Sequence, residues 1–202
     1  MSVLPDVSDG RERVERLAPH ARTATVLEGP RVRIVDVGET APRVSLRRAR
    51  LEELVRAALA LSEKTTSYVW VDGDSELVLH TSRVRVALSD GVVILGIRVE
   101  CDQTGPAEVT IAFAVGRQDL AAGMLMSAPS RPDGPAAVVD RWGAVLVAAA
   151  YRAVVDVITA AAATAGVDRD GRALIPGAVT TDGNSLFVVP QARHAIDRGR
   201  LL

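Results

Sequence analysis

The sequence has very little cysteine, lysine and aromatic side chain. Of its 202 residues one is a cysteine, Cys101, which excludes an internal disulfide and suits a reducing compartment. Aromatic residues make up 3%, too few for a surface that stacks bases or sugars on rings. The net charge is −1 and Lys64 is the single lysine, so the chain has no overall field that would attract nucleic acid or an anionic membrane.

The sequence also lacks the motifs that mark the large enzyme classes. It contains no phosphate loop, no dinucleotide fingerprint, no Gly-x-Ser-x-Gly and no His-Glu-x-x-His. The three histidines are too scattered for a zinc site. Two Asp-x-Asp pairs, Asp72 with Asp74 and Asp168 with Asp170, fall in predicted turns, where aspartate bonds the local backbone. We therefore predict no metal and no cofactor.

Targeting signals are missing as well. The first residues have neither the basic nor the apolar region of a signal peptide. One stretch, residues 143–166, is apolar for the length of a membrane span, but it is rich in alanine and carries Arg152 and Asp156. We expect a soluble, cytoplasmic protein that does not bind a membrane.

The pattern that is present predicts a single α+β domain over residues 23–190, with a flexible segment at 1–22 and a polar tail at 191–202. Its first elements are a hairpin and a helix. The strands of the hairpin are Thr23–Leu27 and Val32–Val37, and the helix runs from Leu46 to Leu61 with Ser45 as its N-cap. Apolar residues at helical spacing make this helix amphipathic.

An antiparallel β-meander follows, because apolar and polar residues alternate and Asp-Gly or Gly-Pro turns separate the runs. The predicted strands are Ser67–Val71, Leu77–Leu88, Val92–Cys101 and Glu108–Val115, and a last hairpin joins 178–180 to 186–189. Between them, Ala137–Ala165 reads as one long helix. It is apolar nearly all round, so we expect it to be buried on the sheet, with Arg152 and Asp156 paired to each other.

The Asp90-Gly91 turn allows residues to be paired across the sheet. A two-residue loop, of the type I′ kind that Asp-Gly favours, places Ser89 opposite Val92 and, counted outward, His80 opposite Cys101. A thiol beside an imidazole is the elementary unit of a cysteine nucleophile. His80 and Cys101 are thus the candidate catalytic pair. The alternative, which we favour, is that both belong to the core, since free cysteine is usually buried.

The same counting places Arg83 opposite Arg98, with Arg85 nearby. Like charges in direct opposition are unfavourable unless an anion or a carboxylate lies between them. These arginines are candidates for an anion site, although Glu100 and Glu108 can neutralise them without a ligand.

Two functional hypotheses follow from the long helix. The first, which we prefer, is a non-catalytic binding or assembly module that forms a homo-oligomer, because the helix is apolar on more sides than one sheet covers. The second is a carrier or small enzyme with a pocket for an apolar molecule between sheet and helix, lined by His80, Cys101 and Tyr151. Nucleic-acid binding through the arginines at 43–50 is the weakest reading, and we expect none.

Overall fold

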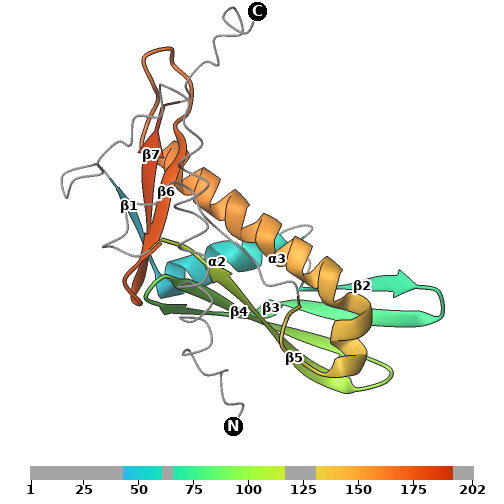
Figure 1. The fold of residues 1–202 in the computed structure, drawn as a ribbon. Coiled ribbons are helices and arrows are strands. Elements are labelled where there is room, and N and C mark those ends of the chain that lie inside the picture. Colours follow the sequence, from blue (N-terminus) through green and yellow to red (C-terminus); the bar gives the residue numbers. More distant parts are fainter. Residues whose placement is uncertain (1–42, 61–65, 117–130, 193–202) are drawn as a thin grey trace, which may run out of the picture.

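The computed structural model describes residues 43–60, 66–116 and 131–192. The predicted hairpin at 23–37 and the segment 1–22 lie outside these ranges. The fold is α+β, with two antiparallel sheets and two helices (Figure 1). In chain order the elements are β1 (Val44–Arg47), α2 (Arg48–Leu59), β2 (Ser67–Asp72), β3 (Ser75–Ser89), β4 (Val92–Cys101), β5 (Gly105–Ala114), α3 (Ala136–Thr164), β6 (Ile175–Thr181) and β7 (Ser185–Gln191).

The predicted meander is confirmed as a four-stranded sheet in the order β2-β3-β4-β5. Each pair is antiparallel, and the large buried cluster of its apolar residues lies on the side of α3, while Val92 and Ile94 form a separate small cluster on the other face. Along β5 the buried residues are Ala107, Val109, Ile111 and Phe113, every second position, as a strand with one covered face requires.

The region before the first helix differs from the prediction. Val44–Arg47 forms strand β1, and the helix begins only at Arg48, with no side-chain cap from Ser45 or from the N-cap residue Arg47. β1 pairs with β7, which places Leu46 opposite Leu186 in the core. Tertiary pairing of an alternating Val-Ser-Leu-Arg run therefore outweighs the local preference of Ser45 for a helix start.

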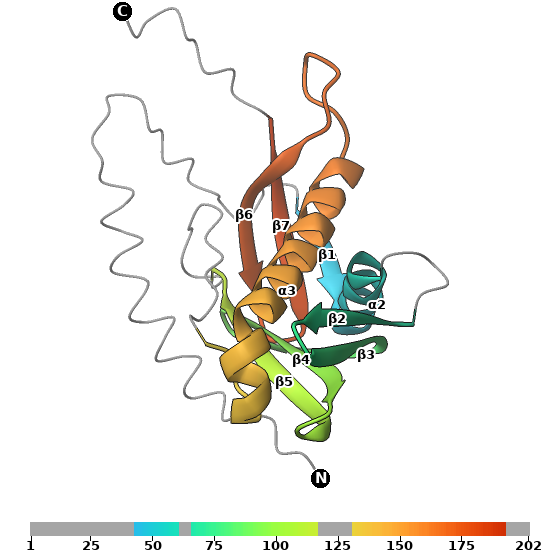
Figure 2. The ribbon, with the colours of Figure 1, turned by 90° about the vertical axis from the view of Figure 1, so that its right-hand side faces the viewer.

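The last predicted hairpin, β6 with β7, joins β1 in a second sheet of order β1-β7-β6. The two sheets meet where Gly116, just after β5, pairs with Thr180 of β6 in a parallel bridge. The amide of Gly116 donates to the carbonyl of Val179 over 2.9 Å, and the amide of Thr181 donates to the carbonyl of Gly116 over 3.1 Å. Figures 1 and 2 show the second sheet standing at an angle to the meander.

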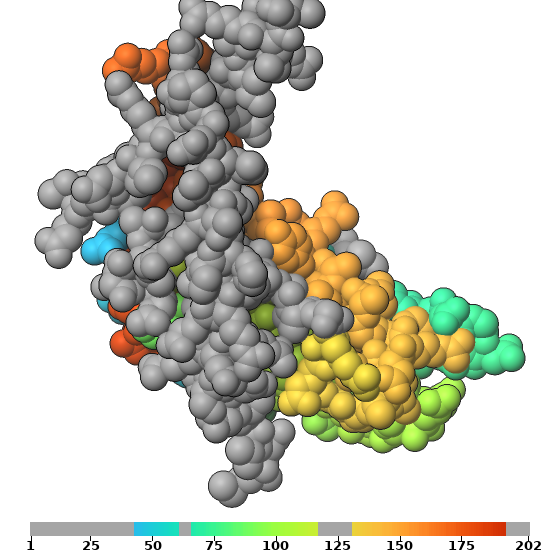
Figure 3. All heavy atoms as spheres, viewed as in Figure 1, coloured from blue at the N-terminus to red at the C-terminus, as the bar shows by residue number. Residues whose placement is uncertain are grey.

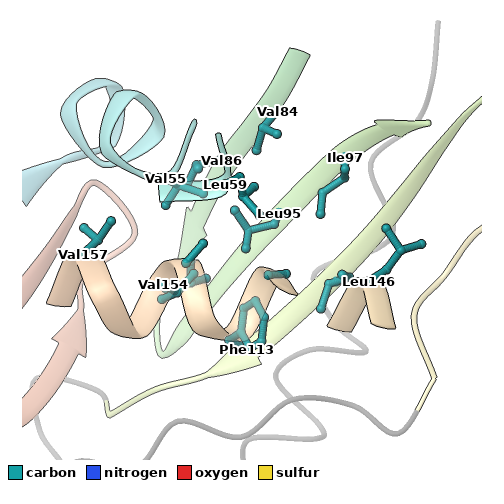
Figure 4. Close-up of a cluster of buried hydrophobic side chains, with 14 of the residues drawn as sticks. Val55, Leu59, Val84, Val86, Leu95, Ile97, Phe113, Leu146, Val154 and Val157 are labelled. Atoms are coloured by element: carbon teal, nitrogen blue, oxygen red, sulfur yellow. The ribbon is translucent and has the colours of Figure 1, made fainter. Parts of the chain in front are cut away.

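The predicted long helix is confirmed as α3, which runs across both sheets (Figure 2). Its inner side packs into one continuous core with the meander, α2 and the second sheet. Leu146 and Val154 of α3 belong to the same buried cluster as Phe113 and Leu95 of the meander, part of which is drawn in Figure 4. Gly143 faces Pro132 in the preceding segment, where an added Cβ would lie 3.2 Å from Pro132 Cδ, so this glycine serves the entry of the helix itself.

The helix is buried on one side rather than all round. Twelve of its 29 residues are buried, and the others lie toward solvent or at the edge of the core. The expected burial on the sheet therefore holds for one side of the helix. The sequence could not reveal this, because alanine and valine occupy both sides of α3.

The turn between β3 and β4 holds the predicted two-residue connection, with Ser89 opposite Val92 and Val86 opposite Leu95. Its expected type I′ conformation is wrong. That turn needs positive φ at both central residues, whereas Gly91 has φ of 75° and no non-glycine residue in the described ranges has a positive φ.

A bulge in β3 changes the pairing farther from this turn. Arg85 lies opposite Gly96, but the next residue pair before it is His80 with Arg98, so four residues of β3 face Ile97 alone. Over this stretch β3 has three residues more than β4. Because side chains alternate between the two faces of a strand and three is odd, the residues that face the core are Leu77 and Leu79 before the bulge but Val84 and Val86 after it.

Beyond the bulge, β3 no longer has β2 as a neighbouring strand, and helix α2 lies there instead. The main-chain amide of Val86 donates to Glu52 Oε2 over 2.9 Å, and Arg56 Nε donates to the carbonyl of Val84 over 2.9 Å. Glu52 and Arg56 also bond each other over 2.5 Å. Two helical side chains thus satisfy backbone groups that a neighbouring strand would otherwise bind.

We expect Glu52→Ala to lower the free energy of unfolding by about 1–2 kcal/mol, because it leaves the Val86 amide without its acceptor and Arg56 without its carboxylate. Urea denaturation measures this. Glu53→Ala is the matched control: Glu53 pairs only with exposed Arg50 over 2.6 Å, and its loss should change stability by less than about 0.5 kcal/mol. Equal effects of both substitutions would contradict the role given to Glu52.

The turn between β6 and β7 depends on an ionised aspartate. Asp182 Oδ1 accepts hydrogen bonds from the amides of Asn184 at 2.8 Å and Ser185 at 2.9 Å. These bonds, the Asn184 amide first, hold the pKa of Asp182 below its ordinary value of 3.8, because they favour the charged carboxylate.

Since the folded-state pKa is lowered, the contribution of Asp182 to stability is fully present above the unfolded pKa and is lost as the pH falls through the folded value. We expect the stability difference between the natural chain and Asp182→Asn to be largest above about pH 5 and to shrink below pH 4. Thermal denaturation at pH 3 and pH 6 tests this, and a difference that grows in acid would contradict it.

Candidate functional site

The predicted pairing of His80 with Cys101 is wrong. The bulge brings Leu77 opposite Cys101 and His80 opposite Arg98. Cys101 shares the core face with Leu77, whereas His80 lies on the other face of the sheet. The imidazole and the thiol are therefore separated by the sheet, and the register gives no support for a reactive pair.

Cys101 lies at the turn end of the meander, beside a small cleft. Its Sγ is 3.2 Å from Thr104 Oγ1, and the residue is 9% exposed. The cleft has a volume of about 140 Å³ and lies among the β2–β3 turn, the β4–β5 turn and the first turns of α3. Its lining includes Asp74, Glu76, Cys101, Asp102, Arg141 and Trp142.

Arg141 ties α3 to the turn beside this cleft. Its Nε donates to Asp72 Oδ2 over 2.8 Å, its Nη2 donates to the Asp72 carbonyl over 2.5 Å, and its Nη1 bonds Ser75 Oγ. The guanidinium is thus engaged by the protein itself. Among the described residues, no three histidine, cysteine or acidic side chains gather closely enough to hold a metal ion. The cleft is small, and its arginine is held by the protein itself.

The predicted opposition of Arg83 and Arg98 is also wrong. Arg83 falls in the bulge, while Arg98 lies between His80 on β3 and Glu108 on β5. His80 Nε2 is 3.7 Å from Glu100 Oε2 on the same face. Carboxylates and basic groups therefore alternate here.

The third arginine of the predicted anion site, Arg85, lies opposite Gly96. An added Cβ at Gly96 would come 3.1 Å from Glu108 Oε1, so the Glu108 side chain passes over this position. The Glu108 carboxylate therefore lies against this part of the face, and the register alone gives no reason for an external anion.

The three residues predicted to line an apolar pocket do not converge. Tyr151 lies on α3, 39% exposed, with its ring 6.1 Å from that of Phe113. Phe113 is eight residues along β5 from Gly105, the partner of Cys101, which is about 25 Å at strand spacing. His80 is on the opposite face of the sheet. The space between meander and α3 is instead filled by fully buried side chains such as Leu95, Ile111 and Leu146.

Among the described residues, the outer side of α3 carries exposed apolar side chains, and part of this helix lies at the surface in Figure 3. Val145 is 42% exposed and Tyr151 39% exposed, although both are large and apolar. We call this side the open face of α3; its exposed residues are Ala144, Val145, Ala148, Tyr151, Arg152, Asp156, Thr159 and Ala160.

Two opposite charges occupy the middle of the open face. Arg152 and Asp156 were expected to pair along the helix, but within the described residues neither forms an ion pair. Both are exposed. The open face therefore combines apolar side chains with one positive and one negative group that are unpaired in a single copy.

By length and composition alone, α3 is also apolar enough to cross a membrane, and 39% of its most apolar window is buried in the fold. A core helix passes the same test, and α3 contributes twelve residues to the interior. The charges of Arg152 and Asp156 at mid-length are unfavourable in lipid.

Comparison with protein-family models, with curated proteins and with solved structures gave no significant match. The site is therefore described from geometry alone. Sequence reasoning identified α3 but missed the bonds of Glu52 and Arg56 to β3 and those of Arg141 to Asp72. The spacing of Glu52 and Arg56 along a helix was visible, but their main-chain partners on β3, the Val86 amide and the Val84 carbonyl, lie 34 and 28 residues away.

We expect Cys101 to react slowly with iodoacetamide in the native protein, because the thiol is 9% exposed, bonds Thr104 and has no histidine beside it in the part of the chain that the structure describes. Mass spectrometry after native and denatured labelling measures the difference. If Cys101 is labelled as fast in the native protein as in urea, this expectation is contradicted and the hypothesis of a reactive cysteine is supported.

Proposed function

We propose that this protein is a non-catalytic assembly module that functions as a homo-oligomer. The observation that carries the proposal is the open face of α3, where a helix that is apolar nearly all round has one side packed in the core and the other left uncovered. Exposed contiguous apolar surface on a folded domain marks an interaction site in most proteins that have it.

The composition of the open face suits a protein partner. It mixes small residues, which let another backbone approach, with Val145 and Tyr151, which supply apolar contact area. The described residues hold no cluster that would carry catalysis: the candidate His80 and Cys101 lie on opposite faces of the sheet. We therefore favour association over chemistry as the role of the domain.

Ala148→Glu should weaken self-association at least about tenfold, because it places a charged side chain at a small, exposed position of the open face. Light scattering and sedimentation at micromolar concentration measure the oligomer. Ala58→Glu is the matched control, the same change at an exposed position of the other helix, α2, and should leave association unchanged. A natural chain that is strictly monomeric at these concentrations would contradict the proposed function.

The alternative is a carrier or small enzyme with an apolar ligand between sheet and α3. In its favour is the cleft at the turn end, which has a thiol and Trp142 in its wall. Its volume of about 140 Å³ is smaller than the several hundred Å³ of most small-molecule sites, and Tyr151 and His80 lie elsewhere. These facts favour assembly.

A further inference from the structure

The open face of α3 repeats at helical spacing. Val145, Ala148, Arg152, Asp156 and Thr159 follow one another at intervals of three, four, four and three residues, so they form one line along the outside of the helix. From Val145 to Thr159 this line is about 21 Å long. Two helices packed along such a line approach to about 8–10 Å when the residues between them are small.

The charges in this line select the direction of a partner helix. If a second α3 runs antiparallel, with the two-fold axis at position 154, residues equidistant from that position face each other. Arg152 then faces the partner's Asp156, and Asp156 faces the partner's Arg152. A parallel arrangement in register would bring arginine against arginine and aspartate against aspartate, which is unfavourable.

The same axis places small residues where the helices come closest. Ala148 faces the partner's Ala160, and Val145 faces the partner's Ala163. Neither pair is bulky, so the charged groups of the middle layer can meet without a gap. The face is thus complementary to itself in charge and in size, as a two-fold interface requires.

We propose that the occupant of the open face is the α3 helix of a second copy, packed antiparallel, with Arg152 and Asp156 forming two reciprocal ion pairs across the interface. This inference rests on the proposed function and specifies its contact. Lipid is a poorer occupant because both charges stand in the middle of the face.

Strand β2 is the other exposed apolar surface to be considered. It has one strand neighbour in the described sheet, and Val69 and Val71 are 49% and 65% exposed. Ser67–Val71 carries no charge that would select a partner, whereas the open face of α3 does. Pairing through β2 is therefore an alternative outcome of the experiment below.

Two charge reversals test the contact. Arg152→Asp gives a chain with two acids at the contact, and Asp156→Arg gives a chain with two bases, so each alone should associate at least about tenfold more weakly than the natural chain. An equimolar mixture of the two should associate again, to within about threefold of the natural chain, because each acid then meets a base. Sedimentation equilibrium measures all three constants.

The matched controls reverse two exposed charges outside α3. Arg169→Asp and Asp170→Arg change the net charge equally and should associate as the natural chain does, alone and mixed. Circular dichroism confirms that each variant is folded.

A mixture that stays dissociated while the natural chain self-associates would overturn the α3 contact and leave the proposed function intact. Undiminished association of both single variants would have the same meaning and would direct attention to β2. A monomeric natural chain would overturn both proposals. Sedimentation of the natural chain with vesicles of neutral lipid, without self-association, would overturn both in favour of a membrane.

Cross-linking distinguishes antiparallel from parallel packing. In a Cys101→Ala background, Ala148→Cys mixed with Ala160→Cys should form the mixed disulfide at least about tenfold faster than either forms a disulfide with itself. Faster self-cross-linking of Ala148→Cys would overturn the antiparallel arrangement, while the association of the natural chain would still support self-assembly.

Discussion

The fold depends on covering a helix that is apolar on nearly every side. An isolated α3 would expose its apolar side chains to water, and both sheets pack against it. The meander packs on its first half and the β1-β7-β6 sheet on its second half. Burial of one residue such as Leu146 contributes about 1.5–3 kcal/mol, so the inner side of α3 is a large part of the driving force for folding. The sheets leave the outer side of α3 exposed.

Other contacts hold the strands at the places where a neighbouring strand ends. Where β2 stops, Glu52 and Arg56 of α2 bond the backbone of β3 in place of a strand. Just after β5, Gly116 pairs with Thr180 of β6 in a parallel bridge that joins the two sheets. At the other end, Arg141 of α3 bonds the β2–β3 turn. Each junction joins elements far apart in sequence, so the arrangement is fixed by polar contacts as well as by the core.

Much of this could be predicted from the sequence where a pattern is local. Alternation at Val109, Ile111 and Phe113 predicts β5, and the Asp90-Gly91 turn predicts the pairing of Val86 with Leu95. The bulge could not be predicted, because Thr81–Val84 contains neither glycine nor proline, and every pair counted beyond it was therefore displaced.

The candidate site shows the same limit. The composition of α3 predicted a long apolar helix, but alanine on both sides concealed which side faces the core. Whether Arg152 and Asp156 bond each other depends on their side-chain conformations, which spacing along a helix does not determine. Arg141 and Asp72 are 69 residues apart, and no local pattern relates them.

The sharing of α3 by both sheets has a consequence for how the protein loses its structure. Buried residues of the helix, the meander and the second sheet belong to one continuous cluster, with Leu186 and Val188 at one end and Trp142 at the other. Separation of either sheet would expose half of the helix to water, so neither sheet is an independent folding unit. The two sheets should therefore unfold cooperatively, and the amides of β4 and β7 should become accessible to hydrogen exchange in the same unfolding event.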